Sequence, residues 1–189
     1  MKISTQLSQK GAALLLSIIM LLIVTLLAVA SMRGVILEER LVGNSRDRQA
    51  ATNGAESALR EAETRLANNF GPPVTTTNCT SIKNLCVLKT LPNDMHLNDW
   101  PWWENSANSI PYKGNNDSTT NIYGLKAQPR WHAAYIGFDP QNSKGAVEVT
   151  DIDLRRRGVG PHYYQINATS QGFSGRIMVN LQTTSVQRY

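Results

Sequence analysis

The sequence predicts an α+β protein in which one long N-terminal helix packs on a small antiparallel sheet. The stretch Gly11–Met32 has 21 residues without a charge after Gly11, and a helix-forming pattern continues from it to about Leu66. From Trp131 onward, apolar and polar residues alternate. These three patterns are typical of a membrane helix, an amphipathic helix and strands, respectively.

The first 11 residues, MKISTQLSQKG, form a short leader whose charged residues are Lys2 and Lys10. The leader is too short and too polar to contain the apolar region of a secretory signal, which here follows Gly11. Cleavage of a conventional signal at Ala28-Val29-Ala30 is the alternative, but the helical pattern continues through that site.

Residues 12–32 are predicted to cross a membrane, because about 20 apolar helical residues span the core of a bilayer. Basic residues do not orient this span, since they occur in the leader and again at Arg33, Arg40 and Arg46. The cysteines and the polar composition of the C-terminal part favour its export. From the residues alone, the topology stays open.

Residues 33–66 are predicted to extend the helix as an amphipathic segment. Over residues 50–66 its apolar stripe is expected to pack on the chain's own domain, and over residues 33–49 on a partner subunit. The glycines at 34, 43 and 54 are expected to mark bends or local melting, since each costs roughly 1 kcal/mol relative to alanine. Charged residues such as Glu61 are assigned to the other faces of the helix, with a supporting pair formed by Glu56 and Arg60. The stripe consists of Leu37, Leu41, Ala51, Ala55, Ala58, Leu59, Ala62 and Leu66.

Residues 67–189 are predicted to form a globular head, because Gly71-Pro72-Pro73 ends the helix. Within the head, Cys79 and Cys86 are expected to form a disulfide that closes a small loop in an oxidising compartment. A metal site or a redox pair is the alternative, but the CxxC spacing and the neighbouring histidines that such sites need are absent.

Three tryptophans, Trp100, Trp102 and Trp103, lie close together in a turn-rich region between residues 74 and 130. They are consistent either with an exposed binding patch or with a small core beneath a long loop, and the small core is the more common arrangement. Two polar clusters in this region, Asp94-His96-Asp99 and residues 115–118, do not follow a calcium-loop template, so no metal is expected.

The C-terminal third is predicted to be a sheet, with strands over Trp131–Phe138 and Ala146–Leu154. A change of parity between Val149 and Ile152 predicts a bulge in the second of these strands. Residues 164–168 and 177–181 are predicted to form a hairpin around the turn Ser170–Gly175, with one apolar face that covers the alanine-rich end of the helix.

Composition and motifs favour a structural protein over an enzyme. No nucleophile-elbow, zinc-protease, Walker or Rossmann motif occurs, and the three histidines are isolated, so neither a catalytic residue nor a cofactor is expected. The formal charge of +5 is mild, and the cluster Arg155, Arg156 and Arg157 is interpreted as a solvated turn. Nucleic acid is therefore a disfavoured partner, although it is not excluded.

The order of segments resembles a type IV pilin. More narrowly, residues 9–63 (QKGAALLLSIIMLLIVTLLAVASMRGVILEERLVGNSRDRQAATNGAESALREAE) resemble the N-terminal region of PilX-type minor pilins, and LEERLVGNSRDRQ and AESALREAE are the most specific phrases. The ending HYYQINATSQGFSGRIMVNLQTTSVQR is similar to the terminal hairpin of that group. The resemblance does not extend to residues 75–130.

This resemblance implies a pilin-like lollipop fold and a processing site. A prepilin peptidase would cut after Gly11, and Ala12 would become the N-methylated first residue of the mature chain. The leader would be cytoplasmic and the head periplasmic, with a single pass through the inner membrane before assembly into an extracellular pilus. The implied partners are the prepilin peptidase, the pilus assembly platform, a tip adhesin, and other minor pilins and the major pilin through the N-terminal helix.

One position departs from the general pilin pattern. Most pilins carry a glutamate at the fifth mature position, where it pairs with the N-terminal amine of a neighbouring subunit, and this chain has Leu16 there. The PilX type and the GspK type of secretion pseudopilins commonly lack this glutamate. A carboxylate in lipid is tolerated only with a partner, so its absence predicts a subunit at or near the filament tip, within a complex that primes assembly.

Three other functions remain as alternatives. The closest is a GspK-like pseudopilin of a type II secretion system. A membrane-anchored periplasmic enzyme belongs to a different class and would need a cluster of titratable residues. The third is adhesion or DNA binding at the tip, through the tryptophans at 100, 102 and 103 or the arginines at 155–157.

Overall fold

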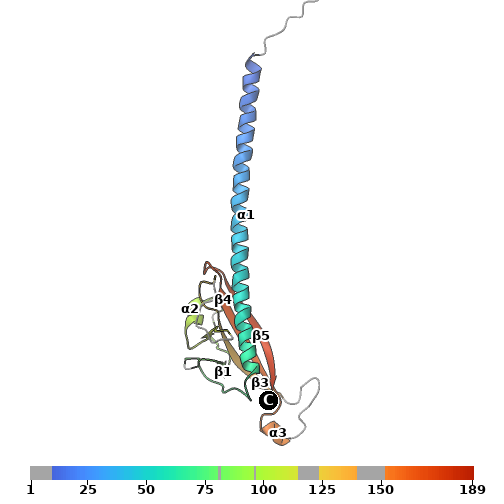
Figure 1. Cartoon of the computed structure of the whole chain (residues 1–189), viewed down its shortest axis with the longest axis vertical. Coiled ribbons are helices and arrows are strands. Elements are labelled where there is room, and N and C mark those ends of the chain that lie inside the picture. The colour runs from blue at the N-terminus through green and yellow to red at the C-terminus, as the bar shows by residue number, and fades with distance from the viewer. Residues whose placement is uncertain (1–9, 81, 96, 115–123, 140–151) are drawn as a thin grey trace, which may run out of the picture. The chain divides into compact units, whose positions relative to one another are not determined.

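The computed structural model describes residues 10–80, 82–95, 97–114, 124–139 and 152–189 (Figure 1). The chain forms two compact units, Met1–Ser45 and Arg46–Tyr189, and we call the second the head unit. Helix α1 (Lys10–Ala67) continues through both units without a break. The predicted long N-terminal helix is therefore confirmed, and none of its three internal glycines interrupts it.

The head unit contains a five-stranded, mostly antiparallel sheet and two short helices. Strands β3, β4 and β5 form its centre and one edge, and β1 and β2 both pair with β3 on the other side. Among the strand pairs of the described residues, only that of β1 with β3 is parallel, and Thr76 adds an isolated parallel bridge to Leu88. The elements are β1 (Val87–Leu88), α2 (Trp100–Glu104), β2 (Ile110–Pro111), β3 (Arg130–Phe138), α3 (Ile152–Arg156), β4 (Pro161–Gln171) and β5 (Met178–Arg188).

The predicted hairpin is confirmed and is longer than its sequence pattern indicated. β4 and β5 pair in unbroken register from Pro161 opposite Arg188 to Gln171 opposite Met178. The strand predicted over Trp131–Phe138 is also confirmed, as β3. A register shift occurs in β3, between Tyr135 and Gly137.

The strand predicted over Ala146–Leu154 is wrong at its C-terminal end, where Ile152–Arg156 forms helix α3. An acidic residue in the first turn and two arginines in the last turn favour a helix at this place, because they complement its dipole. Gly158, at φ +77°, then takes the left-handed conformation that follows many helices. Residues 140–151 lie outside the described part of the chain, as does the predicted bulge between residues 149 and 152.

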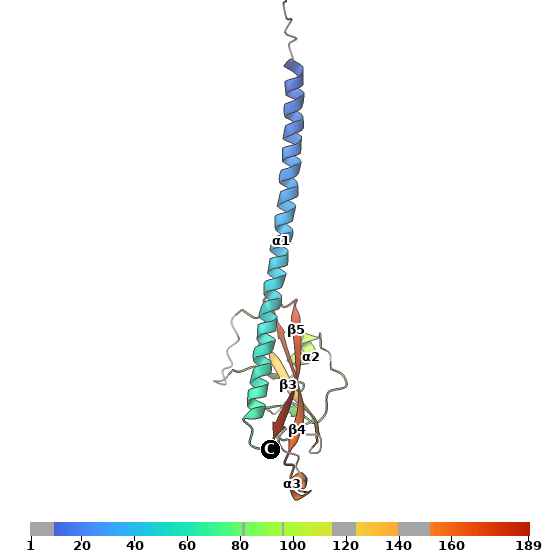
Figure 2. The same cartoon turned by 90° about the vertical axis from the view of Figure 1, so that its right-hand side faces the viewer.

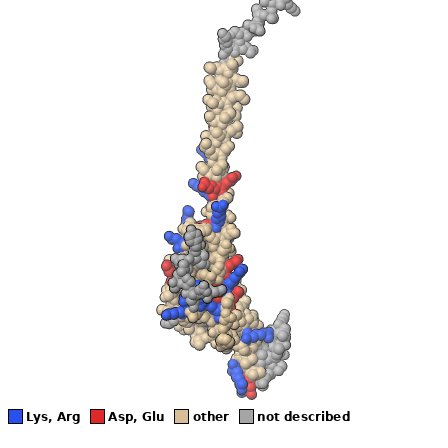
Figure 3. Space-filling model, in the orientation of Figure 1, with Lys and Arg blue, Asp and Glu red and all other residues tan. Residues whose placement is uncertain are grey.

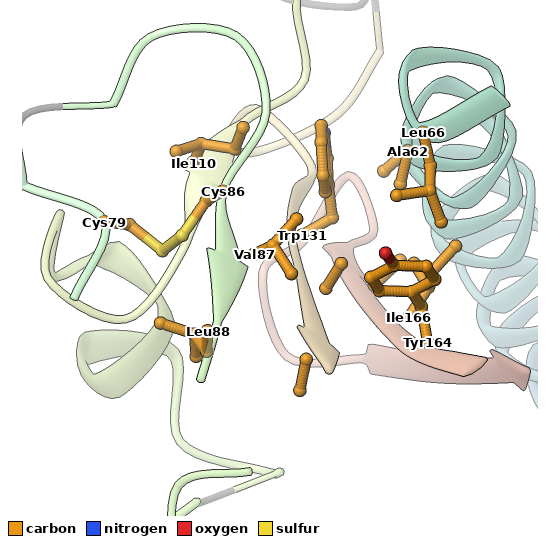
Figure 4. Packing of buried hydrophobic residues seen from close by; sticks show 14 residues of the cluster. Ala62, Leu66, Cys79, Cys86, Val87, Leu88, Ile110, Trp131, Tyr164 and Ile166 are labelled. Atoms are coloured by element: carbon orange, nitrogen blue, oxygen red, sulfur yellow. A yellow bond between two sulfur atoms is a disulfide. The ribbon is translucent and has the colours of Figure 1, made fainter. Parts of the chain in front are cut away.

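The main core lies between α1 and one face of the sheet (Figures 2 and 4). Alternate residues of the paired strands β3 and β4 point to this face, among them Trp131, Tyr164 and Ile166, all at most 1% exposed. The helix contributes the buried stripe Ala51, Ala55, Ala58, Ala62 and Leu66. Small side chains on this stripe allow close packing, so the predicted contact of residues 50–66 with the sheet is confirmed.

Gly54 explains why one of the helix glycines occupies its position. A Cβ atom there would lie 2.4 Å from Ser170 Oγ and 2.8 Å from Leu125 Cδ1, so the missing side chain permits the approach of β4 to α1. Gly34 and Gly43 have no atom within 4 Å of such a Cβ position. Gly54 is therefore a packing residue rather than a bend.

Two acidic residues of α1, Asp47 and Glu61, are buried, although charged residues were expected on the faces of the helix away from the apolar stripe. The Glu61 carboxylate accepts hydrogen bonds from the backbone N–H of Lys113 at 2.8 Å and of Gly114 at 2.9 Å, and it pairs with Arg65 Nε at 2.8 Å. Arg65 in turn donates to the carbonyl oxygen of Asn84 at 3.1 Å. This pair therefore holds two separate loops against the helix.

Asp47 makes the corresponding contact near the N-terminal end of the head unit. Its carboxylate accepts hydrogen bonds from the backbone N–H of Ser174 at 3.2 Å and from the Ser174 hydroxyl, in the turn between β4 and β5. A Cβ on Gly172 would lie 2.0 Å from Asp47 Oδ1 and 2.6 Å from its backbone oxygen. The glycine lets the turn approach the helix closely enough for this clamp to form.

The opposite face of the sheet carries a second, aromatic core beneath α2. His132 is fully buried and stacks on Trp103, with ring centroids 5.3 Å apart, while its Nε2 lies 3.2 Å from the side-chain amide of Asn167. Trp102 meets Trp103 edge to face at 5.0 Å. Burial lowers the pKa of His132 to about 4, because the interior disfavours the charged imidazolium.

We predict that Glu61→Gln destabilises the head unit by about 2–3 kcal/mol, because it leaves Arg65 and two backbone N–H groups with a poorer partner in a buried site. Glu56→Gln is the matched control, since Glu56 pairs with Arg60 at the same i,i+4 spacing but both side chains are at least 50% exposed. Its expected cost is below about 0.5 kcal/mol. Denaturant unfolding of the full-length chain in detergent, followed by tryptophan fluorescence, measures both values, and equal costs would contradict the assignment.

We also predict that the head unit loses stability as the pH falls from about 6.5 towards 4. His132 is neutral in the folded state, whereas in the unfolded chain it binds a proton below its ordinary pKa of about 6.5. The unfolded state is therefore favoured progressively below pH 6.5, by at most about 3 kcal/mol near pH 4. A His132→Gln variant should lose this share of the acid sensitivity, so parallel pH profiles of the two unfolding free energies would refute the prediction.

Candidate functional site

The first unit of the chain consists of a helix whose described side chains are all exposed. Residues 12–46 of α1 are all exposed, and the large apolar side chains among them are each at least 47% exposed. On the face seen in Figure 3, the apolar part of this helix carries no Lys, Arg, Asp or Glu, and the sequence has none between Ala12 and Met32. By length and composition, α1 contains a segment able to cross a membrane.

The few polar side chains in the apolar segment are bonded within the helix. The hydroxyls of Ser17, Thr25 and Ser31 donate to backbone carbonyls three or four residues earlier, at 2.7–2.9 Å. A helix also satisfies its own backbone groups, which is the main requirement for a segment in lipid. This segment therefore presents an apolar surface to its surroundings.

The predicted processing and filament positions lie at the N-terminal end of this helix. Gly11 and Ala12 lie in its first turns, next to Lys10, and Leu16 is 64% exposed within the apolar surface. The leader residues 1–9 lie outside the described part of the chain. The charged residues nearest to Leu16 in the sequence are Lys10 before it and Arg33 after it.

Residues 33–46 keep an apolar stripe without a cover. Leu37 and Leu41 are 61% and 68% exposed, and Ile36 and Val42 are 50% exposed. The apolar stripe of α1 is therefore buried from Ala51 onward and exposed before Asp47. Cover of residues 33–49 by another subunit stays a prediction, and within that range Asp47 is buried against the head unit of the same chain.

The disulfide predicted from the cysteine spacing is present. Cys79 and Cys86 are joined with their Cα atoms 5.5 Å apart, and both are buried. The bridge leads directly into β1, and the backbone N–H of Cys79 donates to the carbonyl oxygen of Ala107 at 2.8 Å. It therefore fastens the loop that precedes β1 to the segment that follows α2.

The three tryptophans do not form one exposed surface. Trp103 is fully buried, Trp102 is 8% exposed, and only Trp100 is partly open to solvent. The indole N–H of Trp103 donates to the carbonyl oxygen of Leu97 at 3.3 Å, inside the head unit. This arrangement favours the small core over a binding patch.

The arginine cluster lies at α3, which Figures 1 and 2 both place away from α2 in the head unit. Arg155 and Arg156 are in the last turn of α3 and Arg157 follows it. Arg156 pairs with Asp153 at 3.9 Å, with both side chains more than 75% exposed. The cluster is thus solvated, and it does not combine with the tryptophans into one site.

Within the described ranges, no group of three histidine, cysteine or acidic side chains could hold a metal ion. His96 and residues 115–118, which belong to the two polar clusters considered from the sequence, lie outside those ranges. The functional residues that the sequence reasoning missed are the buried acids Asp47 and Glu61. Their positions relative to the buried alanines could have predicted this burial. Asp47 lies four residues before Ala51, and Glu61 lies between Ala58 and Ala62.

Residues 10–60 match the family described as PilX N-terminal. No curated protein matches the chain significantly. No solved structure does so either. The matched residues cover the whole exposed helix and continue into the part of α1 that packs on the sheet. The N-terminal helix therefore has the sequence of the PilX N-terminal family, and this match, with the long apolar helix and the disulfide in the head unit, supports a type IV pilus minor pilin of the PilX type.

Proposed function

We propose that this minor pilin is a subunit of the complex that primes type IV pilus assembly and that it remains at the pilus tip. The observation that carries the proposal is the exposure of every residue from 12 to 46, combined with Leu16 at the position where most pilins have a glutamate. The exposed helix needs an apolar surrounding, which the inner membrane supplies first and the helices of neighbouring pilins supply afterwards.

The position of Leu16 supports a place at the end of the filament. A glutamate in lipid or in a helical core is tolerated when a neighbour provides a positive partner, here the N-terminal amine of the subunit above. A subunit with no pilin above it has no such amine to meet. Leucine removes the unpaired charge, so it suits the terminal subunit.

The proposed topology has the leader in the cytoplasm and the head unit in the periplasm, before transfer to the extracellular pilus. The disulfide between Cys79 and Cys86 supports this orientation, because such bonds persist in oxidising compartments. In this proposal, a prepilin peptidase removes residues 1–11, and the assembly platform then inserts the mature helix among those of the major pilin and the other minor pilins. The subunit supports adhesion or twitching motility through the pilus that it helps to start.

We predict that the membrane-extracted protein has the intact mass of a chain that begins at N-methylated Ala12. The physical reason is that Gly11, at the junction of the polar leader and the apolar helix, leaves the peptide bond accessible at the membrane surface. A Gly11→Leu variant should keep its leader. An uncut wild-type chain, or one that starts near Ser31, would contradict the assigned processing.

We further predict that an epitope on the head unit is found at pilus ends rather than along the shaft, and that deleting the subunit reduces pilus number severalfold. Immunogold labelling of sheared pili measures the first quantity and a pilus count measures the second. Even labelling of the shaft would exclude the tip position. Normal pilus number together with a defect in the secretion of exoproteins would instead support the GspK-like pseudopilin.

A further inference from the structure

Strand β5 forms a long edge of the sheet that has no partner strand among the described residues. In the order β1-β3-β4-β5 it is the last strand. Its 11 residues pair with β4, and no other backbone hydrogen bond among the described residues involves Met178–Gln187. On the other side of β3, the strands β1 and β2 have only two residues each. The sheet therefore exposes its backbone chiefly along β5.

The hydrogen bonds at the two ends of the β4–β5 hairpin show which groups of β5 point outward. The backbone N–H of Gly172 donates to the carbonyl oxygen of Ile177 at 2.9 Å, and that of Gly160 donates to the carbonyl oxygen of Tyr189 at 3.1 Å. In an antiparallel pair, such hydrogen-bonded residues alternate with residues whose N–H and C=O point away from the partner strand. In β5, the odd-numbered residues therefore bond to β4 and the even-numbered ones face the outer edge. The outward-facing residues in its exposed half are Gln182, Thr184 and Val186.

This edge lacks the features by which sheets avoid pairing with other chains. Edge strands are commonly kept very short, or they carry charged side chains, a proline or a bulge. β5 is about twice as long as a typical strand. It has neither a proline nor a charged residue before Arg188, and its register with β4 contains no bulge. An edge of this kind can accept a further strand.

The chemistry of the edge selects an extended polypeptide as its partner. Alternating N–H and C=O groups are complementary to the backbone of another strand, which would lie about 4.8 Å from β5. Pairing of two copies through β5 would bury little apolar surface, because the side chains beside the edge are mostly polar, as at Thr183 and Ser185. An extended segment of a different protein fits better, since backbone hydrogen bonds provide much of the affinity in strand addition. The uncharged side chains of the edge require no acidic or basic motif in that segment.

We propose that the outer edge of β5 binds an extended segment of another exported protein by β-strand addition. The backbone groups of Gln182, Thr184 and Val186 exchange hydrogen bonds with that segment, which becomes the strand next to β5. The inference goes beyond the proposed function, from which it takes only the export of the head unit. It does not depend on the position of the subunit in the pilus.

The test is photo-crosslinking in piliated cells from a benzophenone amino acid placed in the full-length chain at position 182, 184 or 186, one position at a time. Mass spectrometry then maps the cross-linked peptides. The three probes are expected to mark one segment of another protein at positions that advance by two residues from probe to probe, because facing residues of paired strands advance together. Absence of cross-links to another protein, or cross-links without this step, would overturn the inference. Cross-links to β5 of a second copy, or to another part of the same chain, would overturn it as well.

A proline at position 184 tests whether the contact uses the backbone. Thr184→Pro removes an outward N–H and leaves the hydrogen bonds to β4 intact, so it should lower the cross-link yield from positions 182 and 186 roughly fivefold or more. Thr184→Val keeps the N–H and should retain the yield. Thr184→Lys places a charge on the edge and should reduce the yield as well, which provides a second variant if the proline prevents folding. A yield that neither the proline nor the lysine lowers would contradict strand addition.

The oxidation state of Cys79 and Cys86 in the same cells separates this inference from the proposed function. Oxidised cysteines are expected, because the disulfide persists in an oxidising compartment. Oxidised cysteines without the stepped cross-links would overturn the strand addition alone. Reduced cysteines would overturn both the export of the head unit and the strand addition that depends on it.

Discussion

The contact between α1 and the sheet is the interaction on which the head unit depends, and acidic residues fasten it near both ends. Between Asp47 and Leu66 the helix presents small residues that allow the strands to approach, so backbone and side chains pack closely along five turns. Asp47 holds the β4–β5 turn and Glu61 holds the loops around Lys113 and Asn84. The phrases LEERLVGNSRDRQ and SQGFSG, distant in sequence, thus meet at Asp47 and Ser174.

Before Asp47 the same helix is exposed, and none of the described residues of the chain buries it. Burying a large aliphatic side chain stabilises by about 1.5–3 kcal/mol, so a row of exposed leucines, isoleucines and valines strongly favours any apolar surrounding. Because the hydroxyls and backbone groups of this segment are already bonded, neither lipid nor other helices would leave them unsatisfied. A surface of this kind can leave the membrane and enter a bundle of helices at little cost, as the proposed pathway of assembly requires.

The sequence predicted those elements whose pattern lies within a short stretch of neighbouring residues. The long helix, β3, the β4–β5 hairpin and the disulfide each follow from a period, a turn or a spacing that is visible in a short stretch. Ile152 and Leu154 were misassigned because two apolar residues separated by one position fit a strand and a short helix equally well. The strands β1 and β2 have two residues each and exist through their pairing with β3, which no local pattern encodes. The burial of Trp102 and Trp103 similarly depends on His132, about 30 residues away.

The acidic residues of α1 show that the charge of a side chain does not by itself predict its exposure on such a helix. Asp47 and Glu61 are buried because each meets two or more donors, whereas Glu38 and Glu39 remain exposed on a part of the helix that no described residue covers. A carboxylate is therefore buried in this fold only where hydrogen-bond donors contact it. Between Ala12 and Met32 the sequence contains neither an acid nor a basic side chain that could pair with one. Leu16 agrees with this rule, because its side chain carries no charge. A subunit with a glutamate at this position would need a neighbouring subunit to donate a hydrogen bond to the carboxylate.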